Sequence, residues 1–299
     1  MSAAPALRGR DMALVLVIVA VWAINFLTSA LGLREIPPLL FTALRFGLLL
    51  LPLLFLMKKP PSDQWPRLAA VSLCIGVVHF SLSFTALKLA GDLSSPAIVL
   101  QSYVPMTTVL AWWLLGEKVG WRTCAAIALS FLGVLVLGLD PHVLGNPVAL
   151  ATMLASAFAL AVGTILMKGL RGLDVYSQQG WMAVFSLPSL LLLSAWLEPG
   201  AIANLPEASW VAWLGAAFAA YASSLLGHGL YYWLVQRHPV AQITPWLLLV
   251  PVGAMLLGVA FWGDHPGPRV LIGGAMVLAG VLVIALRAKV RPRTLAEPA

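Results

Sequence analysis

The residue pair best suited to chemistry is His79 and Ser83, which stand four positions apart in a long apolar stretch. At that spacing the two side chains would lie on one face of a helix. An imidazole beside a hydroxyl is the start of a nucleophile–base pair for acyl transfer, but such a pair also needs a carboxylate to orient the imidazole. Aspartates and glutamates occur only near the ends of the apolar stretches or between them. We therefore expect no enzyme, and a membrane-embedded enzyme is the weakest alternative.

A wider set of polar and aromatic residues also falls inside the apolar stretches, where a polar group is costly and therefore a candidate for function. We predict that a substrate in a cavity contacts these residues: Trp22, Asn25, His79, Ser83, Gln101, Tyr103, His228, Tyr231 and Trp246. Packing roles compete with this prediction. His79 and His228 could instead bond to a neighbouring helix, and Asn25 could join two helices.

Two prolines stand inside apolar stretches at corresponding places in the chain. Pro105 and Pro251 each remove a backbone hydrogen bond and should bend a helix. We predict that both act as hinges in a protein that changes conformation. A static kink is the alternative.

Motifs for cofactors and metals are absent from the sequence. There is no Walker loop, HExxH or CxxC, and Cys74 and Cys124 each stand alone in apolar surroundings. We therefore expect no cofactor and no metal. If a proton were coupled to transport, a histidine would have to carry it. Facilitated diffusion needs no such group, and we favour it.

Membrane-spanning helices must position these residues. Of the 299 residues, 61% are hydrophobic and 10% are charged, and the mean hydropathy is +0.95, whereas a soluble domain carries about 25% charged residues. A helix needs about 20 apolar residues to cross a bilayer. The sequence therefore predicts an all-α integral membrane protein with ten transmembrane helices, the eighth of them tilted, protruding or broken. The predicted spans are 11–31, 36–57, 67–89, 95–116, 120–138, 147–168, 175–197, 208–236, 239–262 and 267–287.

The basic residues predict how these spans are oriented. With ten spans, most of the 18 lysines and arginines fall on one side, and only Arg34, Lys88 and Arg269 fall on the other. Positive charge is enriched in cytoplasmic loops. We therefore predict that both termini are cytoplasmic and that the protein spans the plasma membrane, which is the inner membrane of a bacterium.

The chain also contains an internal repeat. Residues 133–137 (GVLVL) match 280–284 (GVLVI) at an offset of 147, and Glu117 matches Asp264 at the same offset. Five helices per repeat is an odd number, so the second repeat must enter the membrane from the opposite side. We predict a tail at 1–10, a first repeat at 11–138, an inverted second repeat at 139–287 and a tail at 288–299. Inverted repeats are typical of secondary transporters, whose substrate site lies near the midplane between the repeats.

The two repeats end alike, in a proline-bearing helix, a short acidic turn and a glycine-rich helix. The turns read Gly116-Glu117-Lys118 and Trp262-Gly263-Asp264, and a Trp22–Phe26 run stands near the start of the chain. These features resemble the EamA-type transporters of the drug/metabolite transporter superfamily, and among them the YddG-type exporters of aromatic amino acids and related metabolites. The resemblance implies a central cavity lined by the third and fourth helices of each repeat, with the first helices contributing. The Asp264-His265 sequence departs from the family's pattern.

Arg45 is the charged residue that falls well inside a predicted span, away from both of its ends. It could reach the membrane surface, bond to a carbonyl or meet a substrate carboxylate. Because the resemblance does not place second helices at the centre, we favour a structural role.

The function expected from the sequence is transport. We predict a secondary transporter or uniporter that moves amino acids, among them aromatic or bulky neutral ones, or related small metabolites by alternating access, in the direction of export. A lipid flippase or channel-like protein is the alternative. The expected partners are the small-molecule substrate and membrane lipid, without nucleic acid, and a monomeric state is compatible with the sequence.

Overall fold

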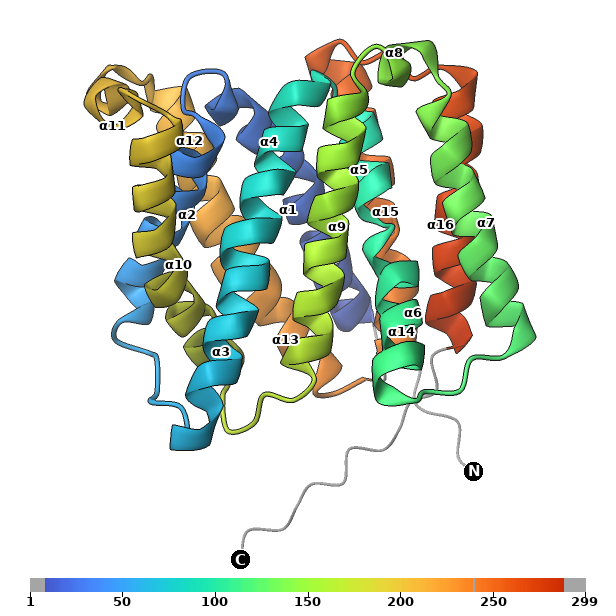
Figure 1. Ribbon diagram of the computed structural model, residues 1–299, viewed down its shortest axis with the longest axis horizontal. Coiled ribbons are helices and arrows are strands. Elements are labelled where there is room, and N and C mark those ends of the chain that lie inside the picture. Colours follow the sequence, from blue (N-terminus) through green and yellow to red (C-terminus); the bar gives the residue numbers. More distant parts are fainter. Residues whose placement is uncertain (1–8, 239, 288–299) are drawn as a thin grey trace, which may run out of the picture.

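The computed structural model describes residues 9–238 and 240–287, and the regular elements within these ranges are helices (Figure 1). The first part of the chain forms α1 (Gly9–Leu33), α2 (Pro38–Leu53), η1 (Ser62–Gln64), α3 (Trp65–Val71), η2 (Ser72–His79), α4 (Phe80–Ala90), α5 (Ser94–Leu100), α6 (Tyr103–Leu115) and α7 (Trp121–Gly138). The second part forms α8 (Pro141–Leu144), α9 (Pro147–Met167), α10 (Val175–Leu197), α11 (Ala201–Asn204), η3 (Leu205–Glu207), α12 (Trp210–Ala217), η4 (Phe218–His228), α13 (Gly229–Val235), α14 (Val240–Leu247), α15 (Leu249–Leu257), η5 (Gly258–Trp262) and α16 (Pro268–Arg287).

The predicted all-α membrane fold is confirmed, with one span shorter than expected. Within the described ranges, nine helical segments are long and apolar enough to cross a membrane. The second predicted span, 36–57, is the apolar helix α2 of 16 residues, because the chain turns at 54–56. At 1.5 Å per residue α2 spans about 24 Å, against about 30 Å for a bilayer core. The count of ten spans therefore depends on this short helix.

The ends of the chain differ slightly from the predicted tails. Helix α1 begins at Gly9, two residues inside the predicted tail 1–10. The rest of that tail and the predicted tail 288–299 lie outside the described residues. Helix α1 begins and α16 ends at the same end of the bundle, the lower end in Figure 1.

The third helix of each repeat contains π-helical turns, in which the backbone is wound more widely than in an α-helix. In the first repeat α3, η2 and α4 form one helix, and in the second repeat α12, η4 and α13 do so. The long eighth span is thus continuous, and its middle is widened. Each π-helical segment ends at one of the predicted histidines, His79 in η2 and His228 in η4.

The last helices of the two repeats, α7 and α16, pack side by side along one edge of the molecule (Figure 1). Gly133 lies against Gly273, and Gly280 lies against the Ala126 carbonyl. Residue numbers therefore rise in opposite directions along the two helices, which are antiparallel. Two helices that correspond in the predicted repeat therefore run in opposite directions, which is the arrangement that an inverted repeat requires. The inversion and the bounds of the repeats stay a prediction.

The first helix of each repeat packs against the third helix of the other repeat. Helix α1 of the first repeat packs on α12 and η4 of the second, and α9 of the second packs on η2 and α4 of the first. Residues predicted to bind substrate therefore lie on helices of opposite repeats that contact each other.

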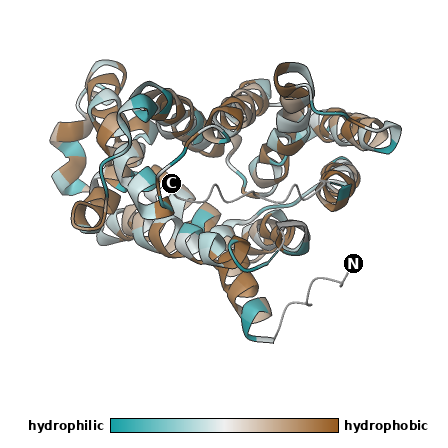
Figure 2. Cartoon of the chain, turned by 90° about the horizontal axis from the view of Figure 1, so that it is seen from below, coloured by the Kyte–Doolittle hydropathy of each residue, from teal (hydrophilic) through white to brown (hydrophobic). Residues whose placement is uncertain are grey.

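The outside of the bundle is apolar. Large side chains such as Phe55, Trp196 and Trp113 are 89%, 78% and 75% exposed. Figure 2 shows hydrophobic residues along much of the helices and hydrophilic residues gathered in the connecting segments. A surface of this kind is suited to contact with lipid.

Candidate substrate-binding site

Arg45 on α2 is a buried cation between the two repeats. Its side chain is 3% exposed. Its Nε and Nη2 donate to the Ser224 hydroxyl on η4, at 3.1 and 2.8 Å. The guanidinium carbon lies 3.6 Å from the centre of the Phe80 ring, and Nη1 is buried without a hydrogen-bond partner in the described part of the chain. Sequence reasoning left Arg45 out of the site, although it is the charged residue in the body of a span.

His79 joins the first repeat to α9 of the second. Its Nδ1 lies 2.8 Å from the Ser156 hydroxyl and 3.1 Å from the Ser156 carbonyl. A carbonyl only accepts, and the Ser156 hydroxyl donates to the His79 carbonyl, so Nδ1 carries the hydrogen. In the neutral ring Nε2 is then an acceptor. The ring lies 4.7 Å from that of Phe80, which covers Arg45.

His228 forms a corresponding group with α1. The Ser223 carbonyl accepts a hydrogen bond from His228 Nδ1 at 3.2 Å and another from Trp22 Nε1 at 3.1 Å. Nε2 of the neutral ring is again an acceptor. The Trp22 ring lies 5.2 Å from the imidazole and 6.1 Å from the Tyr231 ring. Three predicted site residues are thus in contact across the two repeats.

Arg45 lies between these two groups. Its guanidinium stacks on Phe80, which neighbours His79, and bonds to Ser224, which follows the Ser223 that accepts from His228. Tyr103 on α6 and Tyr231 on α13 are partly buried. The structure therefore gathers one cation, two imidazoles and several aromatic rings between the repeats. Such a combination can bind an amphipathic solute that carries a negative charge.

The other predicted residues are placed around this group or away from it. The Asn25 side-chain oxygen on α1 is buried without a hydrogen-bond partner among the described residues. Ser83 on α4 and Gln101, between α5 and α6, are partly buried, and Trp246 on α14 is 40% exposed. No hydrogen bond of the described residues joins Ser83 to His79, whose Nδ1 bonds to α9 instead.

Both predicted hinge prolines follow a break in the fourth helix of their repeat. Pro105 comes after the break between α5 and α6, and Pro251 comes after the break between α14 and α15. A proline has no N–H for the carbonyl four residues earlier. The Gln101 carbonyl, which Pro105 leaves free, accepts from the Val104 N–H at 3.1 Å instead. The break before Pro105 thus has a local cause, and the hinge role of both prolines stays a prediction.

The whole chain is related to known transporters. Its sequence matches the EamA-like transporter family over residues 10–139 and again over 147–286. The chain belongs to this family. The resemblance inferred from the acidic turns and the glycine-rich helices is therefore confirmed.

Several relatives of this EamA-like transporter have descriptive names. It is 29% identical over 292 residues to a "probable amino-acid metabolite efflux pump" of Salmonella typhimurium, covering 94% of this chain and 97% of the relative. It is 29% identical over 251 residues to a "probable terminal-alkyne amino-acid exporter" of Streptantibioticus cattleyicolor, covering 81% and 80%. A solved crystal structure, 18% identical, aligns with a TM-score of 0.60 over 92% of this chain and 96% of the other. That likeness concerns the fold.

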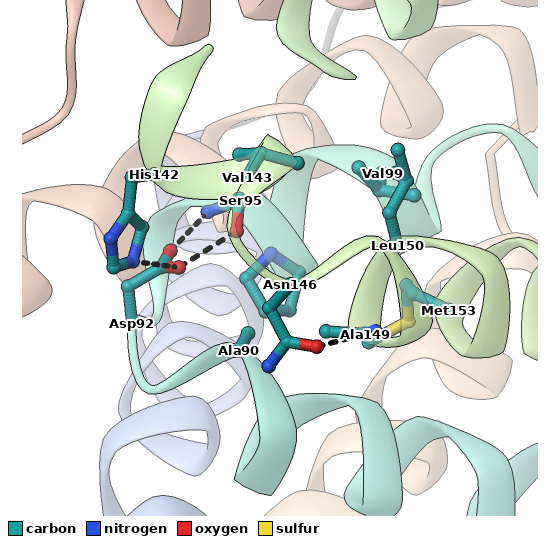
Figure 3. A pocket seen from close by; sticks show the side chains of 11 residues that line it. Ala90, Asp92, Ser95, Val99, His142, Val143, Asn146, Ala149, Leu150 and Met153 are labelled. Atoms are coloured by element: carbon teal, nitrogen blue, oxygen red, sulfur yellow. Dashed lines mark hydrogen bonds and ion pairs between the residues drawn. The ribbon is translucent and has the colours of Figure 1, made fainter. Parts of the chain in front are cut away.

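A small pocket of the EamA-like transporter lies where α4 is followed by α5 and α8 by α9 (Figure 3). Asp92 accepts from the Ser95 N–H and hydroxyl, at 2.7 and 2.9 Å, and lies 3.4 Å from His142 Nε2. Burial raises the pKa of Asp92 above its usual value, against the opposing effect of the Ser95 hydrogen bonds. The pocket holds about 20 Å³, which is room for about one water molecule. It is too small for a metabolite.

A larger cavity of about 410 Å³ lies between the α1–α2 connection and the α10–α12 connection. Two of its three carboxylates, Glu35 and Glu198, already have partners. Glu198 accepts from the backbone of Leu39 and Leu40 at 2.8 and 3.0 Å. The Ser209 hydroxyl and N–H bond to Glu35 and lower the pKa of its carboxyl. Neither cavity is lined by a predicted site residue, and the central cavity stays a prediction.

Proposed function

We propose that this EamA-like transporter exports amino acids or related small metabolites as a uniporter, by alternating access between repeats at 11–138 and 139–287. One observation carries the mechanism: the equivalent acidic turns of the two repeats have the same backbone but different side-chain contacts. The substrate class is supported by the names of two relatives, an amino-acid metabolite efflux pump and an amino-acid exporter.

The backbones of the two acidic turns correspond closely. Gly116 has a φ of +64° and Gly263 a φ of +82°, a left-handed conformation that glycine adopts readily. The next residues, Glu117 and Asp264, each donate their N–H to the carbonyl six positions earlier, at 3.3 and 3.0 Å. The turns lie at opposite ends of the bundle (Figure 1), as an inverted repeat requires.

The carboxylates of these turns have different partners. Asp264, which is 5% exposed, accepts from the N–H groups of Leu93 and Ser94, both at 3.0 Å, and from the Ser94 hydroxyl at 2.5 Å. It thereby fastens the start of α5 to the second repeat. Glu117 instead pairs with Lys168 at 3.0 Å, and both side chains are nearly half exposed.

This difference is what a carrier held in one of two orientations should show. An inverted repeat lets each half adopt the conformation of the other, so that contacts at one end open as those at the other end close. We infer that the Asp264 end is closed here. In the opposite orientation, Glu117 would fasten the start of α14, the counterpart of α5.

The proposed location is the bacterial inner membrane, with both termini in the cytoplasm. The distribution of lysine and arginine supports this orientation, as does the placement of the start of α1 and the end of α16 at one end of the bundle. A green fluorescent protein fused to the C-terminus should fluoresce, whereas an alkaline phosphatase fused there should be inactive. The reverse result would contradict the orientation.

Counterflow in proteoliposomes tests the transport function. Vesicles loaded with unlabelled solute should transiently accumulate labelled solute of the same class, and the rate should saturate. The panel consists of amino acids, nucleosides and sugars, each with and without a pH gradient. Saturable counterflow of amino acids without a pH gradient is the expected result. Non-saturating flux would indicate a channel, and folded protein that exchanges no solute of the panel would contradict the proposal.

A further inference from the structure

We propose that Arg45 binds the carboxylate of the transported solute, with Ser224 and Phe80 positioning its guanidinium. This assignment rests on the proposed transport of amino acids or related metabolites, and it narrows that class to solutes that carry a carboxylate. It also gives a binding role to the cation for which the sequence favoured a structural role.

The first argument is the missing counter-charge. Arg45 is 3% exposed, and the salt bridges of the described residues lie elsewhere in the molecule, at Lys58, His142, Lys168 and His238. A charge inside a membrane protein is costly unless it is paired, and such residues commonly serve binding. A solute carboxylate would supply the negative charge that the described protein groups around Arg45 do not supply.

The second argument is the set of donors that remains available. A guanidinium has five N–H donors in a planar fork. The Ser224 hydroxyl accepts one hydrogen bond from Nε and one from Nη2, so that one edge of the fork is occupied. The hydrogens of Nη1 and the second hydrogen of Nη2 remain, and Nη1 has no partner. These two nitrogens can donate in parallel to both oxygens of a carboxylate.

The third argument is that the guanidinium is already held in place. The Ser224 hydroxyl donates to the Ala219 carbonyl at 2.7 Å, so its lone pairs are directed to Arg45. The Phe80 ring covers one face of the guanidinium at 3.6 Å, where cation–π attraction holds it. A fork fixed in this way loses little freedom when a carboxylate binds.

The surroundings of Arg45 fit the rest of an amino acid. Nδ1 of His79 and of His228 donates to a serine, so each imidazole, when neutral, offers an Nε2 acceptor that an ammonium N–H can use. The rings of Phe46, Phe80 and Phe84 lie 5.6, 3.6 and 5.9 Å from the Arg45 guanidinium carbon and can contact an apolar side chain. A solute with one carboxylate, one ammonium and an apolar side chain therefore matches the group.

The test compares solutes that differ only in the carboxylate. In proteoliposomes, wild-type protein is assayed with phenylalanine and leucine, with their carboxamides, and with 3-phenylpropionate, which has the carboxylate but no ammonium group. We expect the acids to have a KM about 10- to 100-fold lower than the amides, as is typical when a charged hydrogen bond is lost. We expect 3-phenylpropionate to compete with phenylalanine. Equal KM values for acid and amide would overturn the proposal.

Variants assign the discrimination to Arg45. Arg45→Gln should raise the KM of the acids about 10- to 100-fold and bring the acid-to-amide ratio near one. Arg45→Lys, which keeps the charge without the fork, should recover part of the preference. Arg34→Gln is the matched control, because exposed Arg34 also lies over an aromatic ring, that of Trp262, at 4.0 Å. It should leave the ratio unchanged.

Folding is monitored by size-exclusion profile and unfolding temperature in detergent. If Arg45→Gln does not fold, Arg45→Lys and the solute comparison on wild-type protein decide the question. In addition, phenylalanine should raise the unfolding temperature of the wild type more than its amide does. If amino acids exchange with a KM that depends neither on the carboxylate nor on Arg45, this proposal is overturned but the proposed transport function is not. Absence of any exchange or thermal shift with the whole panel would overturn the proposed function as well.

Discussion

The α7–α16 interface and the pair of acidic turns differ in how they obey the repeat symmetry. At the interface, Gly133 lies against Gly273 and Gly280 lies against Ala126. The offset of 147 residues relates Gly133 to Gly280 and Ala126 to Gly273, so that it converts one contact into the other. This part of the molecule is symmetric in its contacts.

The turns have symmetric backbones and asymmetric side-chain contacts. Asp264 is buried on the start of α5, and Glu117 is half exposed beside Lys168. A contact on the symmetry axis is the same in both orientations of the proposed cycle, whereas a contact at one end is made in only one orientation. We therefore interpret α7 and α16 as the fixed pivot and the turns as the parts that change.

The largest effect is expected at the pivot. In Gly133→Val, the added Cβ would lie 2.6 Å from the Gly273 carbonyl oxygen and 2.8 Å from the Val277 nitrogen. These are backbone atoms that cannot move aside, so the variant should lose about 3 kcal/mol of stability. Unfolding in detergent, followed by tryptophan fluorescence, measures it. Gly138→Ala on the same helix is the control, because its Cβ meets only the flexible end of Leu150 at 3.1 Å.

The repeat symmetry extends this prediction to Gly280, the residue that corresponds to Gly133. Gly280→Val should cost a similar amount, since its Cβ would lie 2.5 Å from the Ala126 carbonyl oxygen. A Gly133→Val protein as stable as Gly138→Ala would show that α7 and α16 are not packed closely in the membrane.

The next effect is expected at the closed end. Asp264→Ala leaves the N–H groups of Leu93 and Ser94 without their acceptor, which should cost about 1–3 kcal/mol. It should also open that end. A cysteine in place of Leu93, which is fully buried, should then react faster with a water-soluble maleimide than in the parent Leu93→Cys protein, with Cys74 and Cys124 replaced by alanine. Unchanged labelling would mean that Asp264 is a fixed helix cap.

A smaller effect of the same kind is expected from Gly258→Ala. The new Cβ would collide with the Asp264 carboxylate and push it from α5. The equivalent position in the first repeat is Ala111, beside a turn whose carboxylate points elsewhere. The variant should show part of the stability loss and part of the faster Leu93→Cys labelling of Asp264→Ala. In the Asp264→Ala background it should add little, because both changes remove one interaction. If the stability losses of the two variants add, the loss in Gly258→Ala comes from a disturbed helix and not from the displaced Asp264 carboxylate.

The fold could be predicted from the sequence because a helix that crosses a lipid bilayer needs about 20 apolar residues. Hydropathy predicted ten spans, and nine of them are long apolar helices within the described residues. The repeat of residues 133–137 at 280–284 predicted the inversion, with which the antiparallel packing of α7 and α16 agrees. The exception is α2, since hydropathy counts apolar residues and does not detect the turn after Leu53. The π-helical turns before His79 and His228 were likewise missed, because they depend on packing between helices.

The site was less predictable from the sequence. Polarity within spans identified His79 and His228, but not their partners Ser156 and Ser223, which look like ordinary small residues. Arg45 was assigned to structure because its bond to Ser224 joins residues 179 positions apart. Sequence periodicity describes one helix at a time, whereas this contact depends on how α2 and η4 cross.

The smallest effect on stability is expected at Glu117. Exposed ion pairs contribute about 0–1 kcal/mol, and both Glu117 and Lys168 are nearly half exposed, so Glu117→Gln should unfold at nearly the same temperature as the wild type. Transport should respond differently. If Glu117 fastens α14 in the opposite orientation, Glu117→Gln should slow counterflow, whereas Lys168→Met, which breaks the same ion pair but keeps the carboxylate, should not. Equal transport by the two variants would show that only the Asp264 turn closes an end, and that the symmetry of the turns is limited to their backbone.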